Sequence, residues 1–221
     1  MAGRQQGREF PSNPMKAPSP SIHDALARAF AQGHAREVPD LLSDAHFAQE
    51  GRATPAAVLI AVTDVPENPQ VILTQRPRAM RDHPGQVAFP GGKIDPGEDA
   101  VTAALREAEE ELALPREAVR VIGTSDVYHT GTGFLVTPVV GVVPPGLPLV
   151  PNPQEVEAWF EAPLSLLLDP ASWTANEVFW RGANRRYLEL DWQGFRIWGV
   201  TAAIIANLSR RIAWEGLTDA A

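Results

Sequence analysis

The chain has 221 residues, no cysteine and a formal net charge of −8, with 44% apolar and 21% charged residues. Without cysteine it can form neither a disulfide scaffold nor a thiolate metal site, and its acidity disfavours broad electrostatic binding of nucleic acid. No apolar run approaches the ~20 residues of a membrane span, so we expect a cytoplasmic protein that binds neither nucleic acid nor membrane.

The beginning of the chain divides into a leader and a helical extension. Residues 1–20 contain four prolines among polar residues and little that could be buried, which predicts a flexible leader. Ser21 followed by Asp24 resembles a helix capping box. Apolar side chains then recur at helical spacing, at Ile22, Leu26 and Phe30. We therefore expect a helical extension over 21–52 and the main domain over 53–221.

The first half of the main domain predicts two strands, a loop and a helix. Apolar runs at 56–62 and 71–74, joined through prolines and an asparagine, predict the strands and their turn. Residues 77–97 are dense in Arg, Pro and Gly, which predicts an irregular loop. Pro96 and Pro115 then bracket a proline-free segment that predicts the best-defined helix of the chain.

The second half predicts further strands and closes with a helix. The strands are expected at 119–122, 136–143 and 156–160. A proline-rich loop occupies 144–153, and a short helix is predicted over 163–169. The pattern at 187–198 indicates a hairpin, and 200–212 predicts a final helix with one apolar face.

The helix between the two prolines carries an unusual cluster of acids. Its apolar stripe, about 100° wide, consists of Val101, Ala104, Leu105, Ala108 and Leu112. Glu107, Glu110 and Glu111 occupy the adjacent arc of the helix. Like charges four residues apart destabilise a helix by roughly 0.2–0.5 kcal/mol per pair, and acids near a helix C-terminus destabilise it by roughly 0.3–1 kcal/mol each. A hard divalent cation would compensate for them, whereas an ordinary solvated acidic face is the alternative.

The residues around this cluster complete a longer pattern. Gly92, Glu98, Arg106-Glu107, Glu110-Glu111 and Leu114 stand at the spacing of the Nudix box. That box reads Gly, five residues, Glu, seven residues, Arg-Glu, an aliphatic residue, any residue, Glu-Glu, any residue, Gly and an aliphatic residue. The chain departs from it at Ala108, which suits the buried stripe, and at Ala113, which affects only the turn leaving the helix.

A second set of residues resembles the coenzyme A pyrophosphatase branch of the Nudix hydrolases. Upstream it comprises 73–76, Arg81, Gly85 and 89–92, and downstream it comprises 128–134 and 136–141. Ile72 and Pro77 depart from the signature of that branch. The resemblance covers roughly 53–169 and, more loosely, the C-terminal helix.

The resemblance implies a fold and a metal site. The fold is an α/β/α sandwich with a mixed β-sheet. Glu107, Glu110 and Glu111 would bind Mg²⁺ or Mn²⁺, with Glu98 completing the set of ligands, and Arg106 would orient a box glutamate through a charge-assisted hydrogen bond. The general base is left open between a box glutamate, Glu155 and Glu157.

The loop before the box is expected to hold the phosphates of the substrate. Arg76 and Arg81 stand at signature positions, and arginine suits bidentate contacts with phosphate. Gly91 and Gly92 would let the backbone approach a phosphate closely. Solubilising surface arginines are the alternative for the two basic residues.

These features predict metal-dependent hydrolysis of coenzyme A or a derivative to 3′,5′-ADP and a phosphopantetheine product. The partner is a small nucleotide, and a homodimer is one option for assembly. Another Nudix substrate, such as ADP-ribose, NADH or a dinucleoside polyphosphate, is the first alternative, and a catalytically silent nucleotide sensor is the second. The segment 98–111 holds six acids and one base, so much of the excess negative charge is expected at the metal site.

Overall fold

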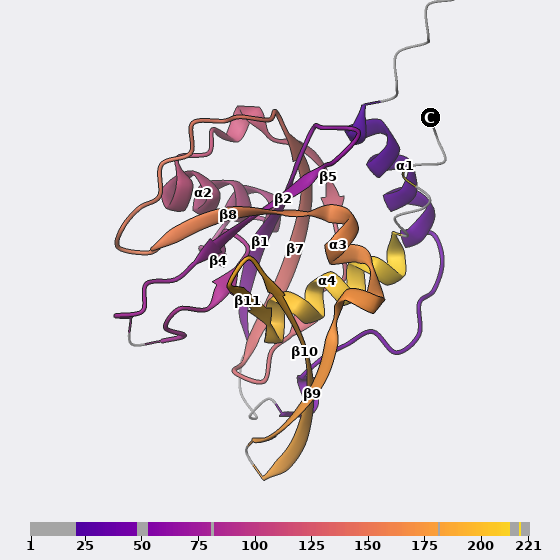
Figure 1. Ribbon diagram of the computed structural model, residues 1–221, viewed down its shortest axis with the longest axis vertical. Helices are drawn as coiled ribbons and strands as arrows, with labels where there is room; N and C mark the ends of the chain where they lie inside the picture. The colour runs from indigo at the N-terminus through magenta and orange to yellow at the C-terminus, as the bar shows by residue number, and fades with distance from the viewer. Residues whose placement is uncertain (1–20, 48–52, 81, 181, 213–216, 218–221) are drawn as a thin grey trace, which may run out of the picture.

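The computed structural model describes residues 21–47, 53–80, 82–180, 182–212 and 217 (Figure 1). The leader predicted over 1–20 and the predicted phosphate ligand Arg81 lie outside this part of the chain. Within it, eight strands form one mixed sheet and three more form a separate antiparallel sheet. No helix in the described ranges is long and apolar enough to cross a membrane.

The large sheet is organised around β1 (Thr54–Thr63). This strand runs parallel to β7 (Phe134–Val143) along its whole length. It runs antiparallel to β2 (Gln70–Gln75) and β4 (Gly91–Lys93). The remaining strands are β3 (Val87–Ala88) and β8 (Ala158–Pro163), which pair with β2, and β5 (Arg120–Thr124) and β6 (Tyr128–His129), which pair with β7.

Two short strands, β3 and β4, lie in a fork between β1 and β2. Strands β1 and β2 pair with each other only at Val62 and Val71, beside the turn that connects them. Strand β8 occupies one edge of β2 over all six residues, so β3 must share the other edge with β1. The loop expected over 77–97 therefore contributes β3 and β4 to the sheet, and β4 places Gly91 and Gly92 inside the fork.

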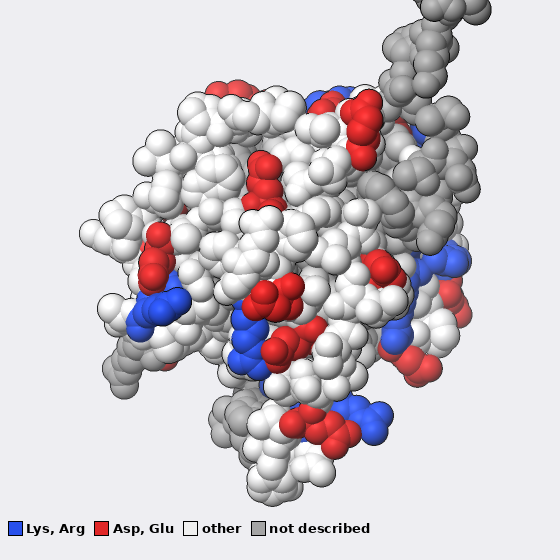
Figure 2. Space-filling view, viewed as in Figure 1, with Lys and Arg blue, Asp and Glu red and all other residues white. Residues whose placement is uncertain are grey.

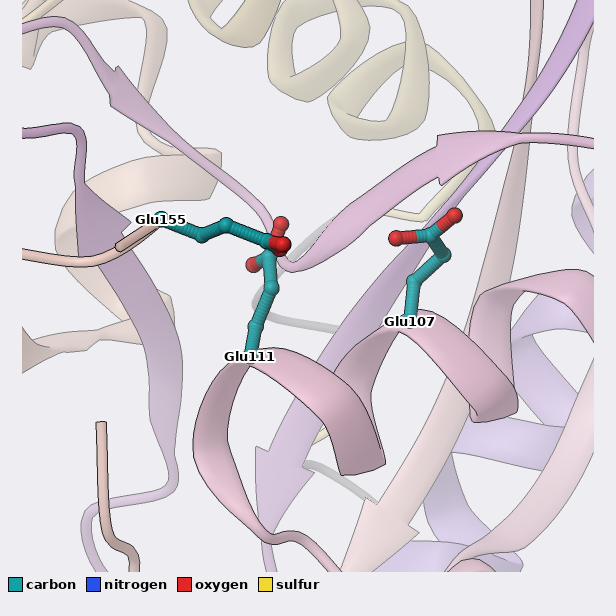
Figure 3. A group of neighbouring side chains, drawn as sticks. All are labelled: Glu107, Glu111 and Glu155. Atoms are coloured by element: carbon teal, nitrogen blue, oxygen red, sulfur yellow. The ribbon is translucent and has the colours of Figure 1, made fainter. Parts of the chain in front are cut away.

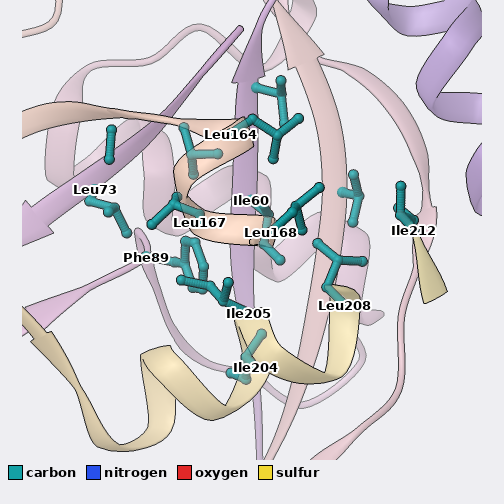
Figure 4. Close-up of a cluster of buried hydrophobic side chains, with 14 of the residues drawn as sticks. Ile60, Leu73, Phe89, Leu164, Leu167, Leu168, Ile204, Ile205, Leu208 and Ile212 are labelled. Carbon is teal, nitrogen blue, oxygen red and sulfur yellow. The ribbon is translucent and has the colours of Figure 1, made fainter. Parts of the chain in front are cut away.

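Helices cover both faces of the sheet, because β1 is apolar on both sides. Ala57, Leu59 and Ala61 pack toward α2 (Ala100–Leu112). Alternate residues such as Ile60 pack on the opposite face, against α1 (Ile22–His34), α3 (Leu164–Leu168) and α4 (Gly199–Arg211). Figure 4 shows side chains of α3 and α4 surrounding Ile60. The predicted α/β/α sandwich with a mixed sheet is confirmed.

The first and last helices meet closely. A Cβ atom at Gly33 of α1 would overlap the carbonyl oxygen of Arg211 at the end of α4 and lie 2.7 Å from its carbonyl carbon. The Arg211 guanidinium donates to both oxygens of Asp126, at 2.7 and 2.8 Å, and to the Gly33 carbonyl at 3.1 Å. Two helices that are 165 residues apart in sequence are thus held by backbone contact and by the hydrogen bond from Arg211 to Gly33, and the pair with Asp126 fixes the Arg211 side chain.

The second sheet includes a strand that the sequence did not predict. The expected hairpin is present as β10 (Ala183–Trp192) and β11 (Phe195–Trp198). Strand β9 (Thr174–Trp180) pairs along β10 from Ala183 to Glu189. Together β9 and the paired part of β10, residues 183–189, form an arm that projects from the body of the molecule (Figure 1). Most side chains of β9 are exposed. The strand therefore lacks the alternation of apolar and polar residues by which a half-buried strand is recognised in a sequence.

Charged side chains are scattered on the face that carries α3, α4 and the arm. Figure 2 shows acids there in small groups, several of them beside a basic residue. Short 3₁₀ helices complete the chain at Ala45–Phe47, Arg116–Ala118 and Pro170–Ser172. The described residues on this face form no extended acidic surface comparable to the acidic segment 98–111.

Candidate active site

Three carboxylates converge beside the C-terminal half of α2. Glu107 and Glu111 stand one helical turn apart on the same side of the helix, and Glu155 comes from the loop that precedes β8 (Figure 3). One oxygen from each lies within 4.8 Å of the others. At an effective dielectric constant of about 20, two charges at this distance repel by about 3 kcal/mol. Such a group needs protons or a cation to neutralise it.

Glu111 is the most constrained of the three. Its side chain is only 6% exposed, and its buried Oε2 atom has no hydrogen-bond partner among the described residues. Burial raises the pKa of Glu111 to about 8, and the charges of Glu107 and Glu155 add to that effect. Burial also raises the pKa of Glu107. An unpaired buried oxygen among like charges is the expected environment of a cation ligand.

Gly91 and Gly92 are required by close contacts on both sides of β4. A Cβ atom at Gly92 would overlap the carboxylate of Glu107, and one at Gly91 would overlap the carbonyl oxygen of Ala57 on the neighbouring strand. Glycine therefore lets the strand approach both β1 and the acidic side chains. The two predicted glycines lie at the carboxylate group.

Arg106 connects three of the box glutamates. Its guanidinium donates to both oxygens of Glu98 at 2.9 and 3.0 Å, to Glu107 at 2.9 Å and to Glu110 at 3.1 Å. The hydrogen bond with Arg106 is the main cause that lowers the pKa of Glu98, and the same bond raises the pKa of Arg106. The expected contact between Arg106 and a box glutamate is present, as is its surface pair with Glu110.

The structure does not bring Glu98 and Glu110 into the group of three carboxylates. Both are bound to Arg106, and the Glu110 side chain is 52% exposed. Their role as metal ligands stays a prediction.

The turn after α2 keeps its left-handed conformation although Ala113 stands where the box has glycine. Ala113 adopts the left-handed conformation, with φ 53° and ψ 32°, and its N–H donates to the carbonyls of Ala108 and Glu109. A residue with a Cβ atom pays about 1–2 kcal/mol for this conformation. The departure from the box therefore costs stability and leaves the path of the chain intact.

The loop expected over 144–153 returns to the end of α2 and carries Glu155 with it. The Asn152 N–H donates to the Glu111 carbonyl at 2.8 Å, and the Asn152 carbonyl accepts the N–H of Glu155 at 3.0 Å. The Val150 N–H donates to the Leu112 carbonyl at 2.8 Å. The sequence offered Glu155 only as a candidate base, since nothing local indicates that this loop folds back on α2.

Arg76, the residue that follows β2, lies near the site. The buried Nε atom of Arg76 has no partner among the described residues, and the positive charge of Arg76 acts on Glu111 by lowering its pKa. The other candidate base, Glu157, is 44% exposed and accepts the N–H of Arg78 at 2.8 Å. Glu157 is therefore engaged elsewhere, whereas Glu155 joins the carboxylate group.

The downstream residues that resemble the coenzyme A branch lie on both faces of the sheet, with Tyr128 and Val136 on the side of α4 and Val139 on the side of α2. Tyr128 is buried on the side of α4, and its hydroxyl donates to Asp44 at 2.7 Å. The Thr130 hydroxyl accepts the N–H of Phe134 at 2.9 Å. Tyr128 and Thr130 therefore make contacts that hold the fold together.

Comparison with known proteins identifies the family. The NUDIX domain matches residues 53–180. The uncharacterized Nudix hydrolase NudL of Photorhabdus laumondii is 44% identical over 158 residues, which cover 71% of this chain and 84% of that protein. NudL of Escherichia coli K12 is 44% identical over 158 residues, 82% of its length. The crystal structure of RenU, a Nudix hydrolase from M. smegmatis, matches 73% of this chain and 86% of that chain with a TM-score of 0.50 at 25% identity. The chain belongs to the Nudix hydrolase family, whose members act on nucleoside diphosphate derivatives.

Proposed function

We propose that the protein hydrolyses the diphosphate bond of coenzyme A, or of an acylated or oxidised derivative, to 3′,5′-ADP and a phosphopantetheine product. The observation that carries the hydrolytic part is the group Glu107, Glu111 and Glu155, with the unpaired Nε of Arg76 beside it. The substrate part rests on the resemblance of 73–76 and 89–92 to the coenzyme A branch.

The residues present fit Mg²⁺ or Mn²⁺. These hard cations take oxygen ligands, and all three members of the group are carboxylates. The orphaned Oε2 of Glu111 would gain a partner. Glu107, Glu111 and Glu155 would hold the cation, and Glu98 and Glu110 would act through Arg106. When bound, the cation lowers the pKa of a coordinated water and neutralises negative charge on the phosphates.

The chain's own residues would position the substrate. Arg76 presents a guanidinium donor for a phosphate oxygen, which suits the planar geometry of that group. Gly91 and Gly92 are proposed as phosphate-binding positions on their place in the sequence pattern, and Gly92 lies directly against the Glu107 carboxylate. Arg106 fixes the orientation of the Glu107 carboxylate. Arg81, the second predicted phosphate ligand, is proposed on its signature position alone.

A panel of substrates tests this proposal. We expect the protein with Mg²⁺ or Mn²⁺ to release 3′,5′-ADP from coenzyme A or acyl-coenzyme A, measured by chromatography, with much lower kcat/KM for NADH and ADP-ribose. Cleavage of ADP-ribose, NADH or a dinucleoside polyphosphate in preference to coenzyme A would replace the branch assignment. Absence of any metal-dependent cleavage would favour the nucleotide sensor.

Variants at three neighbouring glutamates of α2 test whether hydrolysis depends on the carboxylate group. Glu111→Gln should lower kcat more than about 100-fold, beyond what loss of an outer partner of a metal ligand costs. Glu109→Gln, on the same helix turn but paired with Arg116 at 2.7 Å, is the matched control and should retain activity. Glu110→Gln measures the predicted role of Glu110: a loss as large as that of Glu111→Gln would place it among the ligands.

A further inference from the structure

One arginine of the loop between β2 and β3 is held at its base and open at its tip. The N–H of Arg78 donates to the Glu157 carboxylate at 2.8 Å. Its stem passes over Gly85, where an added Cβ atom would lie 3.5 Å from the Arg78 Cγ atom. The Arg78 side chain is nevertheless 79% exposed, and its Nε atom lies 3.9 Å from Glu157. Its terminal Nη1 and Nη2 atoms have no hydrogen-bond partner among the described residues, so the forked end of the guanidinium is available to a ligand.

The backbone fixes where Arg78 stands relative to Arg76. Pro77 joins the two arginines, and a residue that precedes proline is restricted to an extended conformation. The Met80 N–H donates to the Pro77 carbonyl at 3.1 Å and closes a turn that has Arg78 at one of its two central positions. The proline at which the chain departs from the coenzyme A signature thus restricts the spacing between the two arginines.

These contacts place Arg78 beside the active site. At the end of the β2–β8 ladder the Glu157 N–H donates to the Gln75 carbonyl at 2.8 Å, so Glu157 stands opposite Arg76. The charge of Arg76 acts on Glu111. Because Arg78 is bonded to Glu157, it is a neighbour of Arg76. The Nε atom of Arg76 is buried whereas the Arg78 side chain is exposed, so Arg78 lies on the solvent side of this pair of arginines.

The proposed substrate carries a phosphate for which neither the carboxylate group nor Arg76 provides a partner. Coenzyme A has a phosphate monoester on the 3′-oxygen of its ribose, in addition to the diphosphate that is cleaved. A phosphate monoester carries a charge of about −1.5 to −2 at neutral pH. A cation at the carboxylate group would neutralise the diphosphate. In a protein with a net charge of −8, the 3′-phosphate requires a positive group of its own.

We propose that Arg78 binds the 3′-phosphate of coenzyme A through Nη1 and Nη2 while Arg76 holds the diphosphate, an inference that rests on the proposed function. Residues two apart along an extended chain are separated by up to about 7 Å, which is comparable to the span of a ribose between two phosphate esters. Two parallel hydrogen bonds from a guanidinium suit the oxygens of a phosphate. ADP-ribose and NADH lack a 3′-phosphate, so this contact makes the site select coenzyme A against them.

Dephospho-coenzyme A has the same diphosphate bond and lacks only the 3′-phosphate, so it tests the contact. With Mn²⁺ present, the wild-type protein should cleave coenzyme A with a kcat/KM at least about tenfold above that for dephospho-coenzyme A, the effect of hydrogen bonds to a charged group. Arg78→Ala should raise the KM for coenzyme A by a similar factor. It should change the kcat/KM for dephospho-coenzyme A by less than about twofold, because this compound lacks the group that Arg78 binds. The preference between the two substrates should therefore disappear.

Arg186→Ala is the matched control. Arg186 is 85% exposed and lies beside the exposed Glu177 of the arm, as Arg78 lies beside Glu157. Its replacement removes a surface arginine of the same kind and should leave the preference for coenzyme A unchanged. A loss of preference in Arg186→Ala as large as that in Arg78→Ala would show that overall charge, rather than a contact with Arg78, selects the substrate.

Binding of the product separates the 3′-phosphate contact from the hydrolytic reaction. In isothermal titration calorimetry with Mn²⁺, the wild-type protein should bind 3′,5′-ADP at least about tenfold more tightly than 5′-AMP, and Arg78→Ala should bind the two equally. A preference for coenzyme A and for 3′,5′-ADP that survives Arg78→Ala, or the absence of any preference in the wild-type protein, overturns the contact and leaves the proposed function standing. Cleavage of neither substrate overturns the proposed function, and the comparison of the two nucleotides then decides the contact by itself.

Discussion

At the scale of single residues, the two adjacent glycines of β4 have different neighbours. A methyl group at Gly92 would meet the Glu107 carboxylate, whose Oε2 would lie 2.7 Å from it, and this flexible side chain can move aside. A methyl group at Gly91 would meet backbone, including the Val58 Cα atom at 2.7 Å, which cannot move without separating β4 from β1.

We therefore expect opposite consequences from the same substitution. Gly92→Ala should change the free energy of unfolding by less than ~1 kcal/mol and weaken Mn²⁺ binding about tenfold or more, because it displaces Glu107. Gly91→Ala should destabilise the fold by about 2 kcal/mol, as overpacking does. Urea unfolding without metal and Mn²⁺ titration followed by electron paramagnetic resonance measure the two effects. Equal loss of stability in both variants would contradict the assignment.

The buried carboxyl of Glu111 makes stability depend on pH when no metal is bound. Burial raises the pKa of Glu111 to about 8 in the folded chain, from an ordinary value of 4.5. Between these two values the folded chain holds a proton that the unfolded chain has released, so stability falls as the pH rises. The loss should be on the order of 4 kcal/mol across this range.

Urea unfolding in the presence of EDTA, from pH 4.5 to pH 8, measures that loss. The Glu111→Gln variant is the control, because an amide does not titrate, so its stability should fall less steeply over the same range, with Glu107, whose pKa is also raised by burial, contributing the slope that is left. Parallel pH profiles of the two proteins would show that Glu111 ionises freely in the fold.

The sequence placed the acidic residues on the correct helix but could not rank them. Glu107, Glu110 and Glu111 share one arc of the wheel, yet Glu111 is 6% exposed and the Glu110 side chain is 52% exposed. The difference arises from what faces the helix. β4 and the returning loop cover one side of the arc, and solvent meets the other. A helical wheel is drawn from the helix sequence alone, so it cannot show which segments pack against the helix.

At the scale of elements, the loop that follows β7 determines where Glu155 stands. The Asn152 side chain accepts the N–H of Gln154 at 3.1 Å and closes a turn beside the Asn152 carbonyl, which holds Glu155. We expect Asn152→Ala to loosen this turn and to weaken Mn²⁺ binding by up to about tenfold, as loss of an outer partner does.

Two further variants distinguish this positioning effect from a general loss of structure. Asn152→Ser keeps an oxygen acceptor for the turn and should restore most of the affinity. In a Glu155→Gln background, Asn152→Ala should have no further effect on Mn²⁺ binding. An additional loss in that background would mean that Asn152 acts on the site without Glu155.

Elements with strong local patterns were predictable, whereas elements defined by their partners were not. The helix between Pro96 and Pro115 and the strand at β1 follow from proline placement and apolar runs. The two-residue strands β3 and β6 exist only because β2 and β7 lie beside them. Strand β9 is exposed along most of its length, and only its ladder with β10 makes it a strand. Pairing over a distance leaves little trace in a short segment.

At the scale of the whole molecule, the contact between α1 and α4 holds the two ends of the chain together. An alanine in place of glycine stabilises an isolated helix by about 1 kcal/mol. At Gly33 the added methyl group would overlap the Arg211 backbone, which is fixed by its ion pair with Asp126. We expect the overlap to outweigh the helix preference, so that Gly33→Ala destabilises the fold by about 2 kcal/mol.

Thermal unfolding followed by circular dichroism measures this effect. Gln32→Ala is the matched control, since Gln32 is the exposed neighbour on the same helix and its replacement should change stability by less than ~0.5 kcal/mol. A rise in melting temperature for Gly33→Ala would show that the two helices separate at no cost.

The same contact determines when the chain can finish folding. Leu26 and Phe30 of α1 share one apolar cluster with Ile204 and Leu208 of α4, so the cluster joins segments from opposite ends of the sequence. Closing so long a loop carries an entropic cost and slows folding. During synthesis, α1 and the strand face beneath it must wait for the last helix, with apolar side chains open to water and to chaperones. The ribosome therefore synthesises the acidic residues of the active site before α4, and the packing that supports them is complete only after α4 has been synthesised.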